Sequence, residues 1–410
     1  MTNSKYVPKR RFKEFESHGE WGQESLGKIV DFSIKTNSLS REKLSLESYE
    51  VQNIHYGDVL IKFDNVLDLQ RDSLPSIINS KILDFKESLL QDGDLIFADA
   101  AEDSTVGKAI EIRNIGGKNV VSGLHTIAAR PIQLFAPFYL GYYINSNFYH
   151  DQILPLMQGT KVSSISKSNL QVTKITFPKI DEQKELGKFF QTIDSLITLH
   201  QHKLDKLKNL KKSYLAELFP AEGQRVPKRR FPGFEGKWER RKVSELFKIT
   251  RGYVLAATRT KSNKSKTTPY PVYSSQTKDK GLMGFYSKYL YEDAITWTTD
   301  GANAGEVNYR EGKFYCTNVC GVLLSKEVQA DPMIAEAINN IAKKYVSYVG
   351  NPKLMNNVMA DIEISIPQTS SEREKISQFF TDIDKRISLQ QEKLDKLKDL
   401  KKAYLNELFV

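Results

Sequence analysis

Apolar residues recur at alternating spacings of four and three in two long segments of the chain, residues 181–219 and 371–409. Charged residues occupy most of the positions between them. This pattern is typical of a coiled-coil seam, so we expect two long helices that each reach roughly 55 Å at ~1.5 Å per residue. The expected seam positions are Ile193, Ile197, Leu204, Leu207, Tyr214 and Leu218, and then Ile383, Ile387, Leu394, Leu397, Tyr404 and Leu408.

The two helical segments are copies of one another. More than half of their positions are identical at a constant offset of 190 residues, and the run Val7–Phe12 (VPKRRF) returns as Val226–Phe231. Variable and constant segments therefore alternate along the chain. We expect a first variable domain at residues 1–180, a first helix at 181–220, a second variable domain at 221–370 and a second helix at 371–410.

Near-identical seams within one chain are complementary to each other. We therefore expect the two helices to pair antiparallel within the chain as a coiled coil, with the variable domains in pseudo-two-fold arrangement; pairing between two chains is the alternative. His200 and Gln390, and likewise Lys211 and Lys401, interrupt the two seams at matching places. Polar residues at such positions fix the register of a coiled coil.

Each variable domain mixes strand and helix patterns, so the fold class is α+β with two mixed α/β domains, each followed by a long helix. In the first domain we expect turn-then-strand units at 57–61 and 93–97, a strand pair at 118–130, a helix at 137–153, a polar loop at 159–169 and a strand at 172–177. In the second we expect strands at 293–298 and 313–325, a helix at 331–348, a loop at 350–357 and a strand at 362–366. The order of elements is shared while the loop residues differ, as expected of two recognition modules with one scaffold.

The net charge of +10 is concentrated in one segment. Residues 225–280 hold sixteen Lys and Arg against four Asp and Glu, whereas residues 1–224 balance at 28 against 28. A local excess of this size favours an anionic partner such as nucleic acid.

Two cysteines, Cys316 and Cys320, make a disulfide framework unnecessary and fit a reducing compartment. The N-terminal residues lack an apolar run, and no stretch approaches ~18 consecutive apolar residues. We therefore expect a soluble, cytoplasmic protein without a membrane partner.

The stretch Arg251–Lys280 combines cations, which neutralise phosphates, with side chains that read base edges. The alternative is a solvated basic loop. Candidate DNA-contacting residues here are Arg251, Tyr253, Arg259, Lys261, Lys264, Lys266, Tyr273, Gln276, Lys278 and Lys280. Loop residues add Asn303, Asn351, Lys353 and Asn356 in the second domain, and Lys161, Ser163, Ser164 and Lys167 in the first.

Motifs for catalysis, nucleotide binding and metal binding are missing from the sequence. Asn351–Leu354 (NPKL) lacks the second proline and the aromatic residue of an adenine-methyltransferase motif, and no Gly-x4-Gly-Lys-Ser/Thr loop occurs. Asp300–Gly305 is either a phosphate cradle or a hairpin turn. Cys316 and Cys320 have no second ligand pair for zinc. We expect no catalytic residue, no metal ligand and no cofactor in this chain.

Three features together carry a family resemblance: the run Val226–Arg240 (VPKRRFPGFEGKWER), the repeated helix ending Tyr-Leu-Xaa-Glu-Leu-Phe, and the element Asp300–Val307 (DGANAGEV). With these, the whole chain resembles the specificity subunits of type I restriction–modification systems. The first half departs from the pattern, with RRFKEFESHGEW in place of RRFPGFEGKW and Asp103–Lys108 in place of the glycine-rich element.

The resemblance implies a subunit that reads a bipartite target in double-stranded DNA, one half-site per domain. It implies two DNA methyltransferase subunits as partners, which methylate adenine with S-adenosylmethionine, and restriction/translocase subunits that use ATP and Mg²⁺; this chain would not itself be an enzyme. A second apolar stripe on the helices is the candidate partner surface: Leu199, Leu210, Leu215, Leu389, Leu400 and Leu405. The alternative function is a non-catalytic coiled-coil scaffold or interaction protein with a basic nucleic-acid-binding domain.

Overall fold

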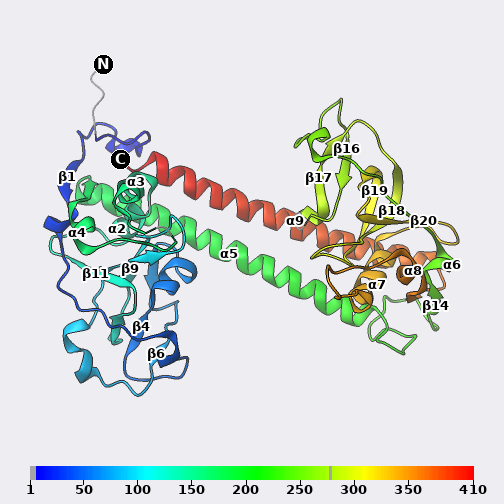
Figure 1. Ribbon diagram of the computed structural model, residues 1–410, viewed down its shortest axis with the longest axis horizontal. Helices are drawn as coiled ribbons and strands as arrows, with labels where there is room; N and C mark the ends of the chain where they lie inside the picture. The colour runs from blue at the N-terminus through cyan, green and yellow to red at the C-terminus, as the bar shows by residue number, and fades with distance from the viewer. Residues whose placement is uncertain (1–5, 160, 277–278) are drawn as a thin grey trace. The chain divides into compact units, whose positions relative to one another are not determined.

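The computed structural model describes residues 6–159, 161–276 and 279–410. The chain divides into two compact units: unit 1 comprises Met1–His200 and Lys393–Val410, and unit 2 comprises Gln201–Glu392. Two long helices, α5 (Ile180–Leu218) and α9 (Ser370–Glu407), each contribute one end to each unit (Figure 1). The boundaries of the two domains and two helices expected from the repeat stay a prediction. The two units are defined by spatial contact, and each contains part of both long helices.

Unit 1 is an α+β domain. Its helices are α1 (Leu26–Ile29), α2 (Tyr139–Ile144), α3 (Asn147–Ile153) and α4 (Lys167–Val172). Its strands are β1 (Gly22–Ser25), β2 (Val30–Asp31), β3 (Leu44–Ser45), β4 (Gln52–Ile54), β5 (Val66–Asp68), β6 (Ser76–Ile77), β7 (Leu95–Ala98), β8 (Ala100–Ala101), β9 (Ala109–Arg113), β10 (Val120–Ser122), β11 (Thr126–Pro131), β12 (Ser163–Ser164) and β13 (Lys174–Phe177).

Mixed sheets organise unit 1. A five-stranded sheet has the order β2-β11-β7-β9-β5 and a four-stranded sheet the order β10-β4-β6-β3; β1 pairs with β13 and β8 with β12. The pairs β5–β9 and β4–β10 are parallel and the others are antiparallel. Tyrosines of α2 and α3 pack beneath the larger sheet in a core that also contains Trp21 and Phe190.

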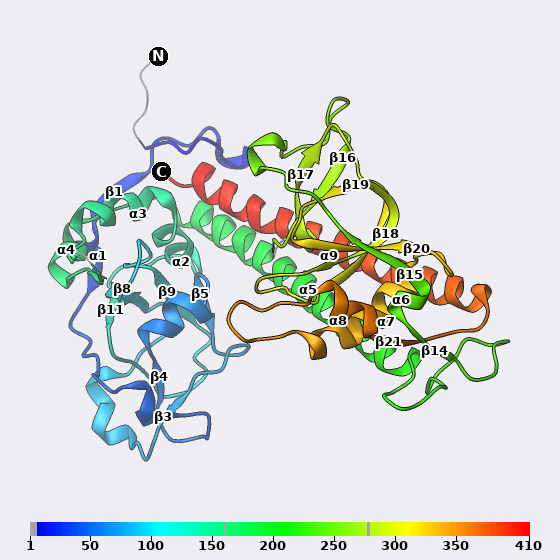
Figure 2. The ribbon, with the colours of Figure 1, turned by 45° about the vertical axis from the view of Figure 1, so that its right-hand side comes forward.

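Unit 2 is a second α+β domain. Its helices are α6 (Val243–Leu246), α7 (Pro332–Ala342) and α8 (Asn356–Asp361), and its strands are β14 (Glu239–Lys242), β15 (Phe247–Arg251), β16 (Tyr270–Tyr273), β17 (Leu282–Tyr286), β18 (Tyr291–Thr298), β19 (Val307–Cys316), β20 (Cys320–Ser325) and β21 (Glu363–Ile366). A mixed six-stranded sheet has the order β15-β20-β18-β19-β16-β17, and β14 pairs with β21 (Figure 2). Helix α7 packs against β19, and Asp331 caps it by accepting a hydrogen bond from the Ile334 amide (2.8 Å).

The two long helices lie side by side and antiparallel within each unit. In unit 1, the start of α5 meets the end of α9, where the rings of Phe189 and Tyr404 are 5.0 Å apart and those of Phe190 and Phe409 are 5.4 Å apart. In unit 2, the end of α5 meets the start of α9 through the repeat-equivalent pairs Tyr214–Phe379 (4.8 Å) and Phe219–Phe380 (5.8 Å). All the expected seam residues are buried or half-buried, as a paired seam requires.

Most predicted elements of the variable domains are confirmed, with the expected helix at 137–153 divided into α2 and α3. The expected helix at 331–348 is too long, because α7 ends at Ala342 and Ser347 already pairs with Lys353. One expected strand is wrong: residues 57–61 do not form a strand, because Asp58–Lys62 is a π-helix. The Asp58 amide donates to the His55 carbonyl (2.9 Å) and the Asp58 carboxylate binds Arg41 (3.0 Å), so Asp58 stabilises a helical turn. Part of the expected strand at 172–177 is also helical, since α4 ends at Val172.

Candidate nucleic-acid interface

Ion pairs neutralise five cations in the first part of the basic segment. Between Arg229 and Lys242, five cations each have a carboxylate partner, and four of these partners are remote in sequence. The pairs are Arg229–Glu217 (2.6 Å), Arg230–Glu372 (2.7 Å), Arg240–Glu363 (3.5 Å), Arg241–Glu245 (2.6 Å) and Lys242–Asp361 (3.0 Å). These cations stabilise unit 2 and have little charge left to offer a ligand.

The repeated VPKRRF run has a structural role in both units. Arg11 donates two hydrogen bonds of 2.7 Å to the buried Glu182 carboxylate, and Arg230 makes the same bidentate contact with Glu372. Glu182 and Glu372 lie at the starts of α5 and α9, where a carboxylate also interacts favourably with the helix dipole. The run therefore fastens the start of each domain to the helix that follows it.

Five cations of the candidate stretch are free of such partners. Within the residues that the structure describes, none of them has a carboxylate within 4.0 Å, and all are exposed: Arg251, Arg259, Lys261, Lys264 and Lys266. Tyr253 beside them is 64% exposed. Residues 251–266 therefore present five unpaired cations close together in sequence, which can attract phosphates.

Local packing determines where this free basic stretch leaves the sheet. It starts as β15 ends, and Gly252 packs so closely on the next strands that a Cβ there would lie 2.2 Å from the Cys316 carbonyl oxygen. Farther along, Lys261 exchanges two backbone hydrogen bonds with Phe285 of β17 (2.9 and 2.8 Å). The part from Arg251 to Lys261 is thus held at both ends, while its long side chains are exposed to solvent.

The far end of the candidate stretch is bound to the protein itself. The buried Arg310 guanidinium carbon lies 3.6 Å from the centre of the Tyr273 ring, and Arg310 donates to the Lys280 carbonyl (2.7 Å). Burial lowers the pKa of Arg310 below its usual value. Lys280 also pairs with Asp384 (3.2 Å), whereas Lys278 lies outside the described residues. Tyr273 and Lys280 thus anchor the stretch; sequence reasoning missed Arg310, which is remote in the chain.

Two loops that are far apart in sequence meet beside this anchored end. The Gly301 amide donates to the Pro352 carbonyl (3.0 Å), and the side-chain amide of Asn303 donates to the Gln276 carbonyl (3.4 Å). Asn351 and Lys353 are exposed on the second loop. These contacts bring together the loops that carry the DNA-contacting candidates Gln276, Asn303, Asn351 and Lys353, while Asn356 is half-buried at the start of α8 with its Oδ1 buried.

Unit 1 builds the same arrangement with different residues. Gly107, with φ of +82°, donates to the Ala98 carbonyl (2.9 Å), and Gly305, with φ of +81°, donates to the Thr298 carbonyl (2.9 Å). The element Asp103–Lys108 is therefore the spatial counterpart of the glycine-rich turn in unit 2, although their sequences differ. Both elements are hairpin turns between strands of the central sheet.

The first domain's candidate residues lie around β12. Ser163 and Ser164 pair with Ala101 and Ala100 of β8, while Lys161 is exposed just before the strand. Lys167 is exposed at the first residue of α4, and its ammonium donates to the Phe32 carbonyl (3.1 Å). These residues are grouped on one edge of unit 1.

A pocket of about 800 Å³ in unit 1 gathers further positive charge. Lys108 and the exposed Lys398 and Lys402 line it, together with the buried Lys401, whose charge is neutralised by Asp64 and Asp194. Neither Lys398 nor Lys402 forms an ion pair within the described ranges. This local excess gives unit 1 a place for anions despite the neutral balance of its sequence.

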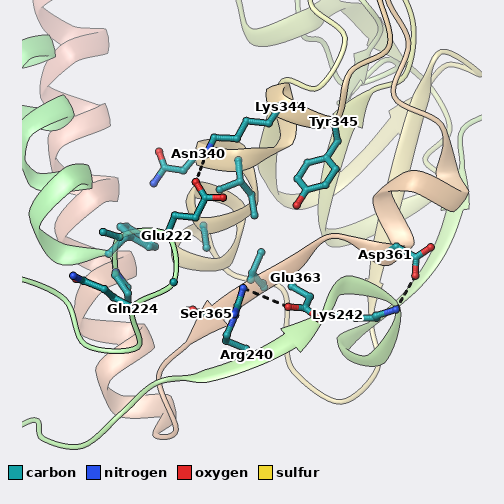
Figure 3. Close-up of a pocket in the computed structure, with 17 residues that line it drawn as sticks. Glu222, Gln224, Arg240, Lys242, Asn340, Lys344, Tyr345, Asp361, Glu363 and Ser365 are labelled. Carbon is teal, nitrogen blue, oxygen red and sulfur yellow. Dashed lines mark hydrogen bonds and ion pairs between the residues drawn. The ribbon is translucent and has the colours of Figure 1, made fainter.

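A pocket of about 420 Å³ in unit 2 offers no comparable charge (Figure 3). Three ion pairs line it: Lys344–Glu222 (2.8 Å), Arg240–Glu363 (3.5 Å) and Lys242–Asp361 (3.0 Å). Because its cations and carboxylates are matched, we do not assign a ligand to it.

The expected apolar stripe is present on both helices. Leu199, Leu210, Leu389 and Leu400 are each between 44% and 49% exposed. Leu215 and Leu405 are half-buried and pack on the cores of unit 2 and unit 1. Four leucines therefore remain available to a partner.

The two cysteines of unit 2 form neither a disulfide nor part of a metal cluster among the described residues. Cys316 and Cys320 are buried and not bonded to each other, and among the described residues no three His, Cys, Asp or Glu side chains are placed to hold a metal ion. None of the helices in the described ranges is both long and apolar enough to cross a bilayer.

Comparison with known proteins identifies one family. The model of the type I restriction modification DNA specificity domain matches twice, at residues 20–209 and 235–399. A putative type I specificity subunit N-terminus from Mycoplasma pneumoniae is 40% identical over 126 residues, which are 30% of this chain and 66% of the relative. The MpnII specificity subunit of the same organism is 34% identical over 142 residues, 34% of this chain and 42% of the relative. The chain spans between 38% and 66% of the length of the first three such relatives.

Solved structures share the fold. The crystal structure of a type I restriction-modification system S subunit from M. genitalium has a TM-score of 0.65 at 15% identity and covers 98% of this chain and 99% of its own. A chain from a structural study of complex assembly and conformational transition of the type I R-M system has a TM-score of 0.53 at 15% identity, covering 94% and 96%.

Proposed function

Because the chain belongs to the family of type I restriction modification DNA specificity domains, we propose that it is the sequence-specificity subunit of a type I restriction–modification complex. It reads a bipartite target in double-stranded DNA, one half-site per variable domain. The double match of the family model carries this proposal, since each half of the chain builds the same scaffold and presents different loops. Two modules that read two half-sites combine the specificity of each. Each mismatched base pair costs ~1–3 kcal/mol of binding free energy, and the costs in the two half-sites add.

Charge and loop chemistry support a division of labour on DNA. In unit 2, the five free cations at 251–266 neutralise phosphates, while Gln276, Asn303 and Asn351 reach base edges with their amide groups. In unit 1, Lys398 and Lys402 are the matching phosphate contacts, and the residues around β12 face the bases.

The two long helices connect the two recognition domains and receive the partner subunits. Two DNA methyltransferase subunits dock on the exposed leucines, and restriction/translocase subunits join that complex. S-adenosylmethionine, ATP and Mg²⁺ act in those partners, and this chain contributes recognition without catalysis. The complex operates in the cytoplasm on duplex DNA.

Duplex binding separates this function from that of a scaffold protein. We expect the isolated chain to shift a random-sequence duplex in a gel at low salt and to release it at high salt, because phosphate contacts exchange with counterions. A scaffold that binds only proteins would leave the duplex unshifted at both salt concentrations. Tight binding that ignores salt would also contradict the proposal.

A further inference from the structure

A hairpin in unit 2 exposes two apolar side chains at its tip. Ser347 and Lys353 exchange two backbone hydrogen bonds of 2.9 Å each, and between them Tyr348 is 69% and Val349 is 92% exposed. Gly350 closes the turn with φ of +76°, a conformation that favours glycine. A tyrosine and a valine held together in solvent are typical of a contact surface.

The base of this hairpin is pinned to the central sheet. The Pro352 carbonyl accepts from the Gly301 amide (3.0 Å), and the Leu354 amide donates to the Thr299 carbonyl (2.9 Å). Leu354 is fully buried, and its carbonyl accepts from the Trp297 indole (3.0 Å). The tip therefore projects from a rigid support, so that little conformational entropy is lost when a partner binds it.

The chemistry around the tip favours DNA as that partner. Lys353 is 4.0 Å from Asp300 at its nearest approach, and the exposed Asn351 lies within the same hairpin. The loop that contacts the hairpin base also carries Asn303. An apolar tip flanked by amides and a cation matches the base steps, base edges and phosphates of a duplex.

Unit 1 contains the same hairpin with another tip. Gln158 and Ser164 exchange backbone hydrogen bonds of 3.0 and 2.8 Å, as Ser347 and Lys353 do. Gly159 is required there, since a Cβ would lie 2.1 Å from the Val162 carbonyl oxygen. The support is thus duplicated, whereas Tyr348 has no aromatic counterpart in the first tip. A repeated support with a changed tip is the pattern expected of an element that sets specificity.

We propose that Tyr348 and Val349 make apolar contact with the bases of the half-site read by unit 2. This inference rests on the proposed function and adds to it two residues that recognise bases through apolar contact. Such contacts are made with thymine methyl groups or by a wedge between base steps. Removing the Tyr348 ring weakens binding of the complete target about tenfold while random-sequence binding, which depends on phosphates, changes little.

The tip can be tested through a single introduced thiol. The native Cys316 and Cys320 are 0% and 3% exposed, and burial raises the pKa of Cys320 to about 11 and that of Cys316 further, so both alkylate slowly. Val349→Cys introduces an accessible thiol, and Val226→Cys, at a site 48% exposed within the ion-paired run, is its matched control. The alkylation rate of each variant is measured at low salt without DNA and with a duplex that carries the complete bipartite target found in a genome-wide methylation map.

We expect the duplex to slow alkylation of Val349→Cys at least about fivefold and to leave Val226→Cys unchanged. If the duplex binds but Val349→Cys reacts at its free rate, the inference is wrong and the proposed function stands. If no variant or parent chain binds the duplex, the proposed function itself fails, and this inference with it. Protection of Val349→Cys by purified methyltransferase subunits without DNA would instead make the tip a protein contact and overturn the proposal.

Discussion

Lys401 Nζ lies 2.7 Å from Asp194 Oδ1, and the repeat forms the same contact a second time, because Lys211 Nζ lies 2.7 Å from Asp384 Oδ1. Each lysine comes from the end of one long helix and each aspartate from the start of the other. Lys401 also binds Asp64 of unit 1, and Lys211 binds Glu336 of unit 2. The two lysines that interrupt the seam therefore join the two helices to each other and to the neighbouring domain.

Removing the lysine from this cluster should destabilise unit 2. Burial alone would lower the pKa of Lys211, but Glu336 and Asp384 raise it, so the ammonium is charged and neutralises both carboxylates. Lys211→Met leaves Glu336 unpaired and Asp384 with Lys280 as its remaining partner, which costs about 3 kcal/mol. We expect a lower urea midpoint for this variant. Lys212→Met, at an exposed neighbouring position, is the control, and equal midpoints for the two variants would show that the cluster does not stabilise the helix pair.

The free cations should determine the salt dependence of DNA binding. Replacing Lys261, Lys264 and Lys266 with Gln removes up to three phosphate contacts, so the slope of log affinity against log salt should fall by up to about 3. Fluorescence anisotropy with a labelled duplex over a range of KCl concentrations measures the slope. The matched control replaces the ion-paired Arg229, Arg241 and Lys242 with Gln. A larger loss of slope in that control would place the DNA contact elsewhere.

Charging the exposed leucines should prevent assembly with methyltransferase subunits. Leu210→Glu with Leu400→Glu places two carboxylates in an apolar contact, where they would be desolvated without partners. Size-exclusion chromatography with purified methyltransferase subunits measures assembly, and circular dichroism checks the fold. Leu46→Glu, at a site 94% exposed outside the helices, is the control. Normal assembly of the doubly charged chain would exclude this stripe as the docking surface.

Alkaline conditions should destabilise unit 1 through its buried tyrosines. Burial raises the pKa of Tyr143 to about 12 from its ordinary 10.0, so this hydroxyl stays protonated in the folded chain where the unfolded chain ionises. Its contribution to stability is complete below pH 10 and is lost as pH rises toward 12, by about 3 kcal/mol. Urea unfolding at successive pH values should show a shallower decline for Tyr143→Phe. The exposed Tyr345→Phe should decline like the parent, and a parallel decline of all three would refute this account.

Periodicity and repetition in the sequence predicted the helices well. The seam depends on local spacing, which the sequence displays directly, and its residues are buried as expected. Residues Gly57–Ile61 misled the prediction because a Gly-Asp pair followed by β-branched residues is typical of a turn and strand. Contacts of Asp58 with His55 and Arg41 stabilise a helical turn instead. Arg41 is 17 residues from Asp58, so a local sequence pattern does not reveal this contact.

The candidate DNA surface was predicted only in outline. The excess charge of residues 225–280 is real, but five cations in its first part are neutralised by partners such as Glu372, which is 142 residues from Arg230. Lys280 was grouped with the free cations, although it pairs with Asp384. The composition gives the number of charged residues but does not show which of them are paired. The unpaired cations that could bind DNA are therefore identified only from the folded structure.

The most direct test of the central claim is a genome-wide map of methylated adenines in cells with and without this chain. The account predicts one bipartite motif, two half-sites at a fixed separation, that is methylated only when the chain is present. It further predicts that Tyr348→Ser reduces methylation of these sites, because recognition of the half-site read by unit 2 is weakened. An unchanged set of methylated adenines after deletion of the chain would contradict the account.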